Sequence, residues 1–568
     1  MDGATAVIRT LEKHGVEYIF GYSGGAALPI FDALVTTGTA IKLILTRHEQ
    51  GATHMADGYA RANGKPGVVL VTSGPGAGNT VSGLMTAHMD SVPMIVLSGQ
   101  QISSMLGLDA FQEADIFNIT MPVVKHNYLV RETNDLPRVI DEAFHLATTG
   151  RPGPVLIDIP KNVASGNFTG KLNHSLDLPA YSVEHQVDKQ KITAIATAWA
   201  QAKRPVILAG HGVLLAKATS NLRSLAEIAD TPVTTTLLGK GVFPETNCLS
   251  LGMLGMHGTA YANKAIVECD FLLNVASRFD DRIVGQVDVF CKDAFIAHID
   301  IDEAELGKMV KPDVGLAADA QEALSALIAE VKPMKHTAWN THLDDYRRRY
   351  PLHYVTDQGL TVQAVIDKLY QLTNGQAIVT TDVGQHQMWA AQFYKTSQPD
   401  QWLSSGGAGT MGFGFPAAIG AQLAKPDAQV VAFVGDGGFQ MTSYELATAC
   451  IHHLPIKVIV LNNHYLGMIR QWQELFFDQH ESGCDLVGNP DFVRLAESYG
   501  AAGINITTEA ELSTKLKEAL AISDRPVVVN AEVIKTDNVF PMVPAGAPLE
   551  HMIIEKPKGR LAKPVGST

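Results

Sequence analysis

Short apolar runs alternate with helical patterns along the first third of the chain. The segment 1–20 has the periodicity of an amphipathic helix that leads into a strand. Four apolar runs follow it, at 41–45, 68–71, 94–97 and 155–159. Continuous runs of this length are typical of strands buried on both faces of a parallel sheet. Glycine-rich joints lie at 21–25 and 73–76, and loops at the carboxyl ends of such strands are where doubly wound sheets bind ligands.

The same alternation recurs in two later parts of the chain. The runs lie at 205–209, 232–237, 271–275 and 295–301, and then at 377–380, 430–434, 456–461 and 527–533. We therefore predict an α/β protein with three doubly wound parallel-sheet domains of ordinary size. The predicted boundaries are 1–165 for the N-terminal domain, 166–189 for a polar linker, 190–335 for the middle domain, 336–355 for a charged helical linker, 356–535 for the third domain and 536–568 for a C-terminal tail or lid.

Composition and charge narrow the functional class. The 568 residues include 46% hydrophobic and 18% charged residues, which is a globular and not a disordered composition. A net charge of −14 disfavours a nucleic-acid or anionic-membrane binder. The five cysteines show no CxxC or zinc-finger spacing, which suits a reducing compartment. There is no apolar signal core and no long uncharged span, so we predict a cytoplasmic protein, or a chain from which a targeting peptide has been removed.

The most informative segment is a predicted strand–helix–strand unit. Residues 430–438 read VVAFVGDGG, and residues 456–463 read IKVIVLNN. Because parallel strands end at the same edge of a sheet, Asp436 and Asn463 are expected to lie close together. A carboxylate and an amide oxygen are ligands that suit Mg²⁺. The bare backbone of Gly437 and Gly438 at a helix start favours a phosphate.

Taken alone, a Gly-Asp-Gly triplet is more often an ordinary strand-to-helix turn. The paired asparagines after the next strand make a binding site the better interpretation, because the Gly-Asp-Gly triplet and the Asn-Asn pair together form the thiamine-diphosphate motif. The resemblance implies that Asp436, Asn463 and the main-chain carbonyl of Tyr465 bind Mg²⁺. Thiamine chemistry also needs a carboxylate at the aminopyrimidine ring, and the candidate is Glu49, between the run at 41–45 and a helix. A glutamate in a first helical turn is commonly explained by the helix dipole, so only the distant motif gives Glu49 a catalytic meaning.

Many further motifs resemble one family across nearly the whole chain. They are GYSGGA at 21–26, RHEQGA at 47–52, TSGPGA at 72–77, DAFQEAD at 109–115, GRPGP at 150–154, LGMHG at 254–258, RFDDR at 278–282, DVGQHQMW at 382–389, SGG at 405–407 and GTMG at 409–412. The chain thus resembles the catalytic subunits of acetohydroxyacid synthase, also called acetolactate synthase. The resemblance implies the thiamine-diphosphate-enzyme fold, with a pyrimidine-binding N-terminal domain, an FAD-binding-like middle domain and a diphosphate- and Mg²⁺-binding third domain.

The family's site residues carry over to matching positions. The resemblance implies catalytic roles for Gly25, Glu49, Gln112, Lys161, Arg282 and Trp472. It implies thiamine-site contacts from Tyr22, Gly24, Val383, Gly384, Gln385, His386, Gly409, Met411, Gly435, Asp436, Gly437, Gly438, Met441, Asn463, Tyr465, Gly467 and Met468. It implies a substrate channel lined by Phe111, Lys161, Met256, Met468 and Trp472. Without the family, Trp472 would be read as a core aromatic residue and Arg282 as a solvated charge.

The resemblance also implies a structural FAD, since the net reaction is not a redox reaction. Its implied contacts are Arg151, Gly210, Gly212, Thr236, Leu237, Leu254, Gly255, Met256, His257, Arg278, Asp280, Arg282, Ile283, Asp300, Ile301 and Asp319. Five positions, Ser23, Ile102, His211, Ala408 and Gly438, depart from the family's usual residues. Of these, Ser23 and Gly438 are expected near the cofactor but change no catalytic group.

The implied reaction is decarboxylation of pyruvate on thiamine diphosphate and transfer of the hydroxyethyl unit to a second 2-oxo acid. The products would be 2-acetolactate from pyruvate and 2-aceto-2-hydroxybutyrate from 2-oxobutyrate, in branched-chain amino-acid biosynthesis. We expect a lid at 540–552, a homodimer or tetramer with shared sites, and a small regulatory subunit.

Three alternative functions are less well supported by the sequence. A flavin-dependent pyruvate oxidase is disfavoured by Arg282 with Trp472, and a simple decarboxylase is disfavoured by the lack of paired active-site histidines. A non-catalytic paralogue is disfavoured by intact Glu49, Asp436 and Asn463.

Overall fold

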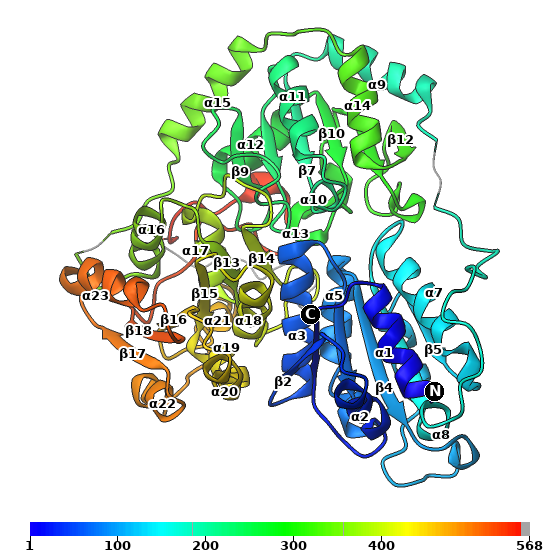
Figure 1. Ribbon diagram of the computed structural model, residues 1–568. Helices are drawn as coiled ribbons and strands as arrows, with labels where there is room; N and C mark the ends of the chain where they lie inside the picture. Colours follow the sequence, from blue (N-terminus) through cyan, green and yellow to red (C-terminus); the bar gives the residue numbers. More distant parts are fainter. Residues whose placement is uncertain (184–185, 356, 558–568) are drawn as a thin grey trace.

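The computed structural model describes residues 1–183, 186–355 and 357–557 and contains three six-stranded sheets. Within these residues, neighbouring strands of each sheet pair in parallel. Helices cover the sheets, and the three units form separate lobes in Figure 1, coloured blue to cyan, green, and yellow to orange. The predicted fold class is confirmed.

The N-terminal sheet has the strand order β2-β1-β3-β4-β6-β5. Its strands are β1 Tyr18–Gly21, β2 Lys42–Leu45, β3 Gly67–Val71, β4 Met94–Gln100, β5 His126–Leu129 and β6 Pro154–Pro160. Its main helices are α1 Gly3–Lys13, α2 Leu28–Thr36, α3 Glu49–Asn63, α5 Val81–Asp90 and α7 Leu136–Thr148. Strands β3, β4 and β6 are fully buried, as their continuous apolar runs predict.

The middle sheet has a different order, β12-β11-β10-β7-β8-β9. Its strands are β7 Pro205–Ala209, β8 Val233–Thr235, β9 Ser250–Met253, β10 Phe271–Val275, β11 Phe295–Asp300 and β12 Val314–Ala317. The helices around it are α9 Lys189–Gln201, α10 Gly212–Leu215, α11 Thr219–Ile228, α12 Ala260–Glu268, α13 Asp281–Val284 and α14 Ala320–Glu330. From β7 the chain adds β8 and β9 on one side of the sheet and then returns to add β10, β11 and β12 on the other side. The boundary between β7 and β10 is therefore a topological switch point, which is where sheets of this kind usually bind ligands.

The third sheet, β14-β13-β15-β16-β18-β17, repeats the order of the N-terminal one. Its strands are β13 Ile378–Thr381, β14 Trp402–Ser404, β15 Val430–Gly435, β16 Lys457–Asn462, β17 Ala502–Ile506 and β18 Val527–Glu532. Its helices are α16 Val362–Thr373, α17 Gln385–Phe393, α18 Gly414–Ala424, α19 Asp436–Thr442, α20 Leu446–Ile451, α21 Gly467–Phe476, α22 Phe492–Ser498 and α23 Glu509–Ala521.

The N-terminal and third domains pack through α3 and α18, which lie side by side in Figure 1. Two glycines allow the close approach. A Cβ at Gly58 would lie 2.1 Å from the Ala417 carbonyl oxygen, and one at Gly420 would lie 1.9 Å from that of Met55. One hydrophobic cluster therefore continues from Met55 to Phe415 and fixes the two domains against each other.

The second predicted linker and the C-terminal segment both pack against the domains. Helix α15, Thr337–Arg349, packs on the middle domain, where Trp339 Nε1 donates a hydrogen bond to the Pro205 carbonyl 3.1 Å away. The segment predicted as a lid, 540–552, lies against the middle domain and α21: Val543 N donates to the Met256 carbonyl, and Met542 is buried. The predicted tail continues to 568, and its part from 558 lies outside the described residues.

Within residues 1–183, 186–355 and 357–557, no helix combines the length and the apolar character needed to cross a membrane.

Candidate functional site

A cavity of about 910 Å³ lies where the three domains meet. Loops after strands of the middle and third sheets line most of it, and the end of α5 closes one side. The predicted thiamine-site residues line one part of it, which we call the thiamine half: Val383, Gly384, Gln385, His386, Gly409, Met411, Gly435, Asp436, Gly437, Gly438, Asn463, Tyr465, Gly467, Met468 and Trp472. The residues predicted to contact FAD line the other part, which we call the flavin half: Arg151, Gly212, Thr236, Leu237, Leu254, Met256, His257, Arg278, Asp280, Arg282, Ile283, Asp300, Ile301 and Asp319.

Asp436 and Asn463 emerge at one sheet edge because β15 and β16 are adjacent and parallel. Asp436 begins α19 and is 1% exposed. Burial raises the pKa of its carboxyl to about 6, and Asn489 Nδ2 donates to Asp436 Oδ2 at 2.7 Å. The Asn463 side-chain oxygen accepts a hydrogen bond from Tyr465 N at 3.1 Å. The described parts of the chain contain no group of three or more His, Cys, Asp and Glu side chains that could hold a metal ion, so a metal here would rely on the carboxylate, the amide and a main-chain oxygen.

Any side chain larger than that of glycine would clash with its neighbours at Gly437 and Gly438. A Cβ at Gly437 would lie 2.8 Å from Leu466 Cδ2, and one at Gly438 would lie 2.5 Å from Asp382 Oδ1. The loop after β15 therefore stays bare and open to the cavity. Such a glycine-lined helix start offers main-chain N–H groups to a phosphate.

Asp382 lies directly behind the glycine edge and holds the neighbouring turn in place. Its carboxylate accepts hydrogen bonds from the main-chain N–H groups of Val383 at 2.8 Å, Gly412 at 3.0 Å and Gly414 at 3.1 Å. Burial raises its pKa to about 6, although these bonds oppose the shift. The carboxylate thus fixes the turn that carries Met411 next to Gly437, whose Cβ would lie 3.7 Å from Met411 Cε.

Three buried polar atoms on the cavity wall have no hydrogen-bond partner: Gln385 Oε1, His386 Nε2 and His257 Nε2. Burial lowers the pKa of His386 and of His257 to about 4 each, so both rings are neutral near pH 7. Buried polar atoms without partners are rare and costly. Their placement therefore fits polar ligands in both halves of the cavity.

The flavin half lies at the switch point of the middle sheet. Arg151 from the N-terminal domain donates to Glu305 at 2.7 Å and Asp302 at 3.1 Å. Burial raises the pKa of Asp300 to about 6. Gly210 and Gly255 support this half from behind the lining: a Cβ at Gly210 would lie 2.1 Å from the Ala276 carbonyl oxygen, and one at Gly255 would lie 2.5 Å from that of Arg282.

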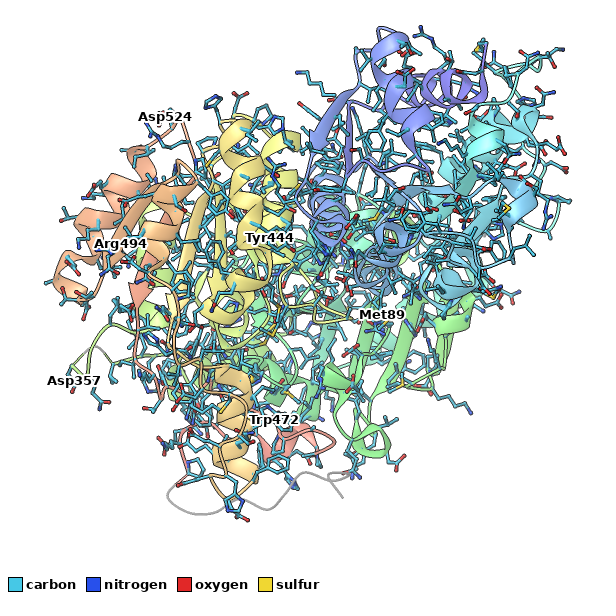
Figure 2. The ribbon with its side chains drawn as sticks, turned by 90° about the horizontal axis from the view of Figure 1, so that it is seen from below. Met89, Asp357, Tyr444, Trp472, Arg494 and Asp524 are labelled. Atoms are coloured by element: carbon cyan, nitrogen blue, oxygen red, sulfur yellow. The ribbon has the colours of Figure 1, made fainter. Side chains whose placement is uncertain are left out.

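Arg282 and Trp472 line the same cavity from different domains. Figure 2 shows Trp472 on its helix beside the middle domain, and its ring packs on Phe476 with centroids 5.4 Å apart. The Arg282 side chain keeps 59% of its surface exposed, and its nearest carboxylate oxygen, from Asp281, is 3.8 Å away. The guanidinium is therefore weakly paired and open to a ligand.

The predicted residues of the N-terminal edge form a second group that does not line this cavity. Glu49 begins α3, is 8% exposed, and accepts a hydrogen bond from Asn79 Nδ2 at 3.0 Å. A Cβ at Gly76 would lie 3.3 Å from Glu49 Oε1, and one at Gly24 would lie 2.5 Å from Thr72 Cγ2.

Gln112 and Gly25 belong to the same edge. A Cβ at Gly74 would lie 2.7 Å from the Gln112 carbonyl oxygen, so the two loops touch. Gln112 has a φ of 57°, an uncommon backbone for a non-glycine residue. Nothing lies within 4 Å of a Cβ built on Gly25, so the space beside it is open.

The remaining predicted residues lie outside the cavity lining. Phe111 is 83% exposed, Met441 49% and Tyr22 41%. Lys161 begins the short helix α8, Lys161–Ala164, and is also exposed.

Three family models match the chain. The "Thiamine pyrophosphate enzyme, N-terminal TPP binding domain" matches 1–119, the central domain matches 192–327 and the "C-terminal TPP binding domain" matches 382–531. The chain is 44% identical to the acetolactate synthase large subunit of Haemophilus influenzae over 98% of this chain and 99% of that protein. It is 47% identical to that of Parasynechococcus marenigrum, over 97% and 91%, and 45% identical to the probable acetolactate synthase large subunit of Methanocaldococcus jannaschii, over 97% and 95%.

The chain belongs to the acetolactate synthase family of thiamine pyrophosphate enzymes. The predicted family is therefore confirmed, and so is thiamine diphosphate as its cofactor class. The two TPP-binding models cover Glu49 at one end of the chain and Asp436 with Asn463 at the other.

Several residues of this family member's site escaped the sequence prediction. Glu445, fully buried, accepts hydrogen bonds from the main-chain N–H groups of Arg47 at 3.0 Å and His48 at 3.1 Å, directly before Glu49. Burial raises its pKa to about 7. Figure 2 shows the neighbouring Tyr444 facing the N-terminal domain. Asn79 and Asn489 were missed as well, because their partners are distant in sequence and no motif marks them. Asp382 opens the motif at 382–389, but its bonds to the main chain of Gly412 and Gly414 did not follow from that motif.

Proposed function

We propose that this protein is an acetolactate synthase that decarboxylates pyruvate and transfers the hydroxyethyl unit to a second 2-oxo acid. Pyruvate as acceptor gives 2-acetolactate, and 2-oxobutyrate gives 2-aceto-2-hydroxybutyrate, the precursors of branched-chain amino acids. The observation that carries the proposal is the single cavity that joins the Asp436–Asn463 edge to Arg282 and Trp472.

Thiamine diphosphate, when bound, supplies the nucleophilic carbon and the electron sink that decarboxylation needs. Asp436, Asn463 and the Tyr465 carbonyl would hold Mg²⁺. The burial of Asp436, which raises the pKa of its carboxyl, supports this role, because a nearby cation stabilises the charged form of a buried carboxylate. Gly437 and Gly438 would present main-chain N–H groups to the diphosphate.

Glu49 would exchange a proton with the aminopyrimidine ring and so promote loss of the proton from the reacting carbon. Its position supports this role: the carboxylate is buried and hydrogen-bonded to one amide, and the space beside Gly25 is open. Gln112, held in a strained backbone next to Gly74, would face the same space.

Arg282 would bind the carboxylate of the acceptor 2-oxo acid, and Trp472 would contact its alkyl group. A weakly paired guanidinium in a cavity is suited to bidentate carboxylate binding. Met256 and Met468 line the same space, and Phe111 and Lys161 would complete the channel from the partner chain.

The flavin half of the cavity would hold FAD as a structural group. Support comes from the switch-point topology, the buried carboxyl of Asp300 at the end of β11, where a ribose hydroxyl would bind, and the partnerless His257 Nε2.

We further propose a homodimer or tetramer whose thiamine site is shared between chains. Within one chain Glu49 contacts Asn79 and lies away from the cavity lined by Asp436, so a second chain is needed to bring the two carboxylates together. The name "large subunit" of the relatives supports a small regulatory partner.

The direct test is an assay for acetolactate from pyruvate with Mg²⁺, with and without thiamine diphosphate. Cofactor-dependent acetolactate, and a mixed product when 2-oxobutyrate is added, are expected. Anaerobic bleaching of the flavin by pyruvate without acetolactate would instead identify an oxidase, and free acetaldehyde as the main product would identify a decarboxylase.

A further inference from the structure

The carboxyl end of α5 lies where all three domains meet. Figure 2 shows Met89 at this junction, between the N-terminal domain, the middle domain and a loop of the third domain. Met89, Asp90 and Ser91 all line the large cavity. No motif in the sequence marks this segment, and none of the site roles above uses it.

The Asp90 carboxylate accepts hydrogen bonds from three donors. They are Gly407 N at 2.7 Å, Arg61 Nη2 at 2.8 Å and Gly406 N at 3.1 Å. Asp90 is 2% exposed, so these bonds form away from water, where charge-assisted bonds are strongest. Two of the donors belong to the third domain and one to the N-terminal domain.

Other contacts from α5 reach the same loop. Thr86 Oγ1 and Thr410 Oγ1 are 2.6 Å apart. A Cβ at Gly407 would lie 2.9 Å from Met89 Cβ, so the loop lies directly on the helix end. Arg61 Nη1 also donates to the Ser404 carbonyl at 3.1 Å. The loop 404–411 is thus attached to the N-terminal domain at both ends, and its residues Gly409 and Met411 line the thiamine half.

The end of α5 is itself held by the flavin half. His211 Nδ1 lies 3.0 Å from the Asp90 carbonyl oxygen, and because that oxygen can only accept, the ring N–H donates. Burial lowers the pKa of His211 to about 4, so the ring stays neutral. Arg151 Nε donates to Ser91 Oγ at 2.9 Å. The helix end therefore has a fixed position from which to hold the loop.

We propose that Asp90 is a positioning residue of the thiamine site: its carboxylate fixes the loop 404–411 and with it the place of Met411 and Gly409. The proposal rests on the proposed function, which puts thiamine diphosphate in that half of the cavity. Asp90 touches the loop's amides and not the reacting atoms, so it acts on cofactor binding.

A carboxylate is required at this position because every partner is a donor. In Asp90→Asn one carboxylate oxygen becomes an NH₂ group that must face Gly406 N, Gly407 N or Arg61. At least one buried bond is then lost and two donors repel. Asp57 provides a matched control, since its carboxylate is also buried and pairs with Arg61 at 2.5 Å. It accepts from Arg61 on α3 and is not among the acceptors of the loop amides.

The experiment compares the full-length wild type, Asp90→Asn and Asp57→Asn by titration of thiamine diphosphate with Mg²⁺, followed by calorimetry. Circular dichroism and the thermal midpoint establish folding. For Asp90→Asn we expect binding weakened by about tenfold or more, as loss of a buried charge-assisted bond predicts, with kcat at saturating cofactor changed less than the affinity. For Asp57→Asn we expect affinity within about twofold of wild type, because this change leaves in place the hydrogen bonds from Arg61 to Asp90 and to the Ser404 carbonyl and those from the loop amides to Asp90.

Equal affinities of Asp90→Asn and wild type would overturn the proposal, and so would an equal loss in Asp57→Asn. If Asp90→Asn does not fold, Thr86→Val removes a single hydroxyl contact to the same loop. A two- to fivefold weaker binding is expected there, and unchanged binding would overturn the proposal. A wild type that binds thiamine diphosphate but makes no acetolactate would contradict the proposed function while leaving this binding test valid.

Discussion

The N-terminal and third sheets share one strand order but carry their chemistry at different strands. In the N-terminal sheet Glu49 follows β2, the outermost strand, whereas in the third sheet Asp436 follows the central strand β15 and Asn463 follows its neighbour β16. The turn directly before Glu49 is held by Glu445 of the third domain, which accepts hydrogen bonds from two main-chain N–H groups of that turn. The Asp436 edge has bare glycines and opens to the cavity.

This difference shows that a repeated topology does not make two equivalent half-sites. One edge holds a buried carboxylate that does not line the cavity, and the other combines bare glycines with a buried carboxylate that does. The packing of α3 on α18 fixes the two domains against each other within one chain. The comparison therefore predicts that proton transfer depends on the first edge and cofactor retention on the second, and mutations should separate the two.

The largest expected effect is on turnover in Glu49→Gln. The change removes the proton-transfer carboxyl but keeps the shape and the acceptor for Asn79. A loss of about 10² to 10⁴-fold in kcat is expected, as for other general acid–base groups, with thiamine diphosphate affinity close to wild type. Steady-state kinetics and calorimetry measure the two. Glu142→Gln, at a buried glutamate paired with Arg138, controls for the substitution type, and near wild-type turnover in Glu49→Gln would remove Glu49 from catalysis.

Asp436→Ala should weaken cofactor binding more than it slows turnover at saturating cofactor. It removes the charged oxygen from the proposed metal site, so Mg²⁺ and diphosphate binding should weaken by about tenfold or more. Activity should return in part at saturating cofactor. Asp491→Ala, which removes the exposed N-cap of α22 in the same domain, should leave cofactor affinity unchanged. An Asp436→Ala protein that retains wild-type affinity would contradict the metal assignment.

Trp472→Leu should change specificity more than rate. A lost apolar contact of one methylene is worth about 1–3 kcal/mol, so the preference for 2-oxobutyrate over pyruvate as acceptor should fall while acetolactate formation continues. The product ratio in a competition between the two acceptors measures this. Phe476→Leu removes the aromatic neighbour of Trp472 without lining the cavity and serves as control. An unchanged ratio in Trp472→Leu would place Trp472 outside the acceptor pocket.

The smallest expected effect concerns the pH dependence of stability at the contact of Glu445 with α3. Burial raises the pKa of Glu445 from 4.5 to about 7, so between these values the folded protein binds more protons than the unfolded chain. Stability should therefore fall as the pH rises from 4.5 to 7 and level off above 7. Glu445→Gln stays uncharged and should lose less stability over this window. Thermal midpoints at pH 5 and pH 7.5 test it, and identical pH slopes would exclude a role for Glu445.

The sequence predicts the sheet interiors better than their edges. The apolar runs at 205–209 and 271–275 coincide with β7 and β10, because interior strands are buried on both faces. The strands without a predicted run are β5, β9, β12, β14 and β17, which all lie at sheet edges. They are short or partly exposed, so no continuous apolar run marks them.

The candidate site shows a similar limit. Asp436 and Asn463 were predictable because local motifs on adjacent strands carry them. Glu445 was not, since its partner Arg47 lies 398 residues away in the chain. Asp90 likewise contacts Gly407 across 317 residues. Single-sequence motifs report local chemistry, and the groups that hold the motifs in place come from whichever domain packs on them.

The shared thiamine site is tested most directly by mixing two inactive variants, Glu49→Gln and Asp436→Ala, under conditions that allow subunit exchange. In a mixed dimer one site combines Glu49 of the second variant with Asp436 of the first, and the other site lacks both. Activity should therefore reappear, up to about half of the wild-type value per mixed dimer for symmetric association. If exchange is verified by mass spectrometry and no activity returns, the two carboxylates serve the same chain and the shared site is wrong.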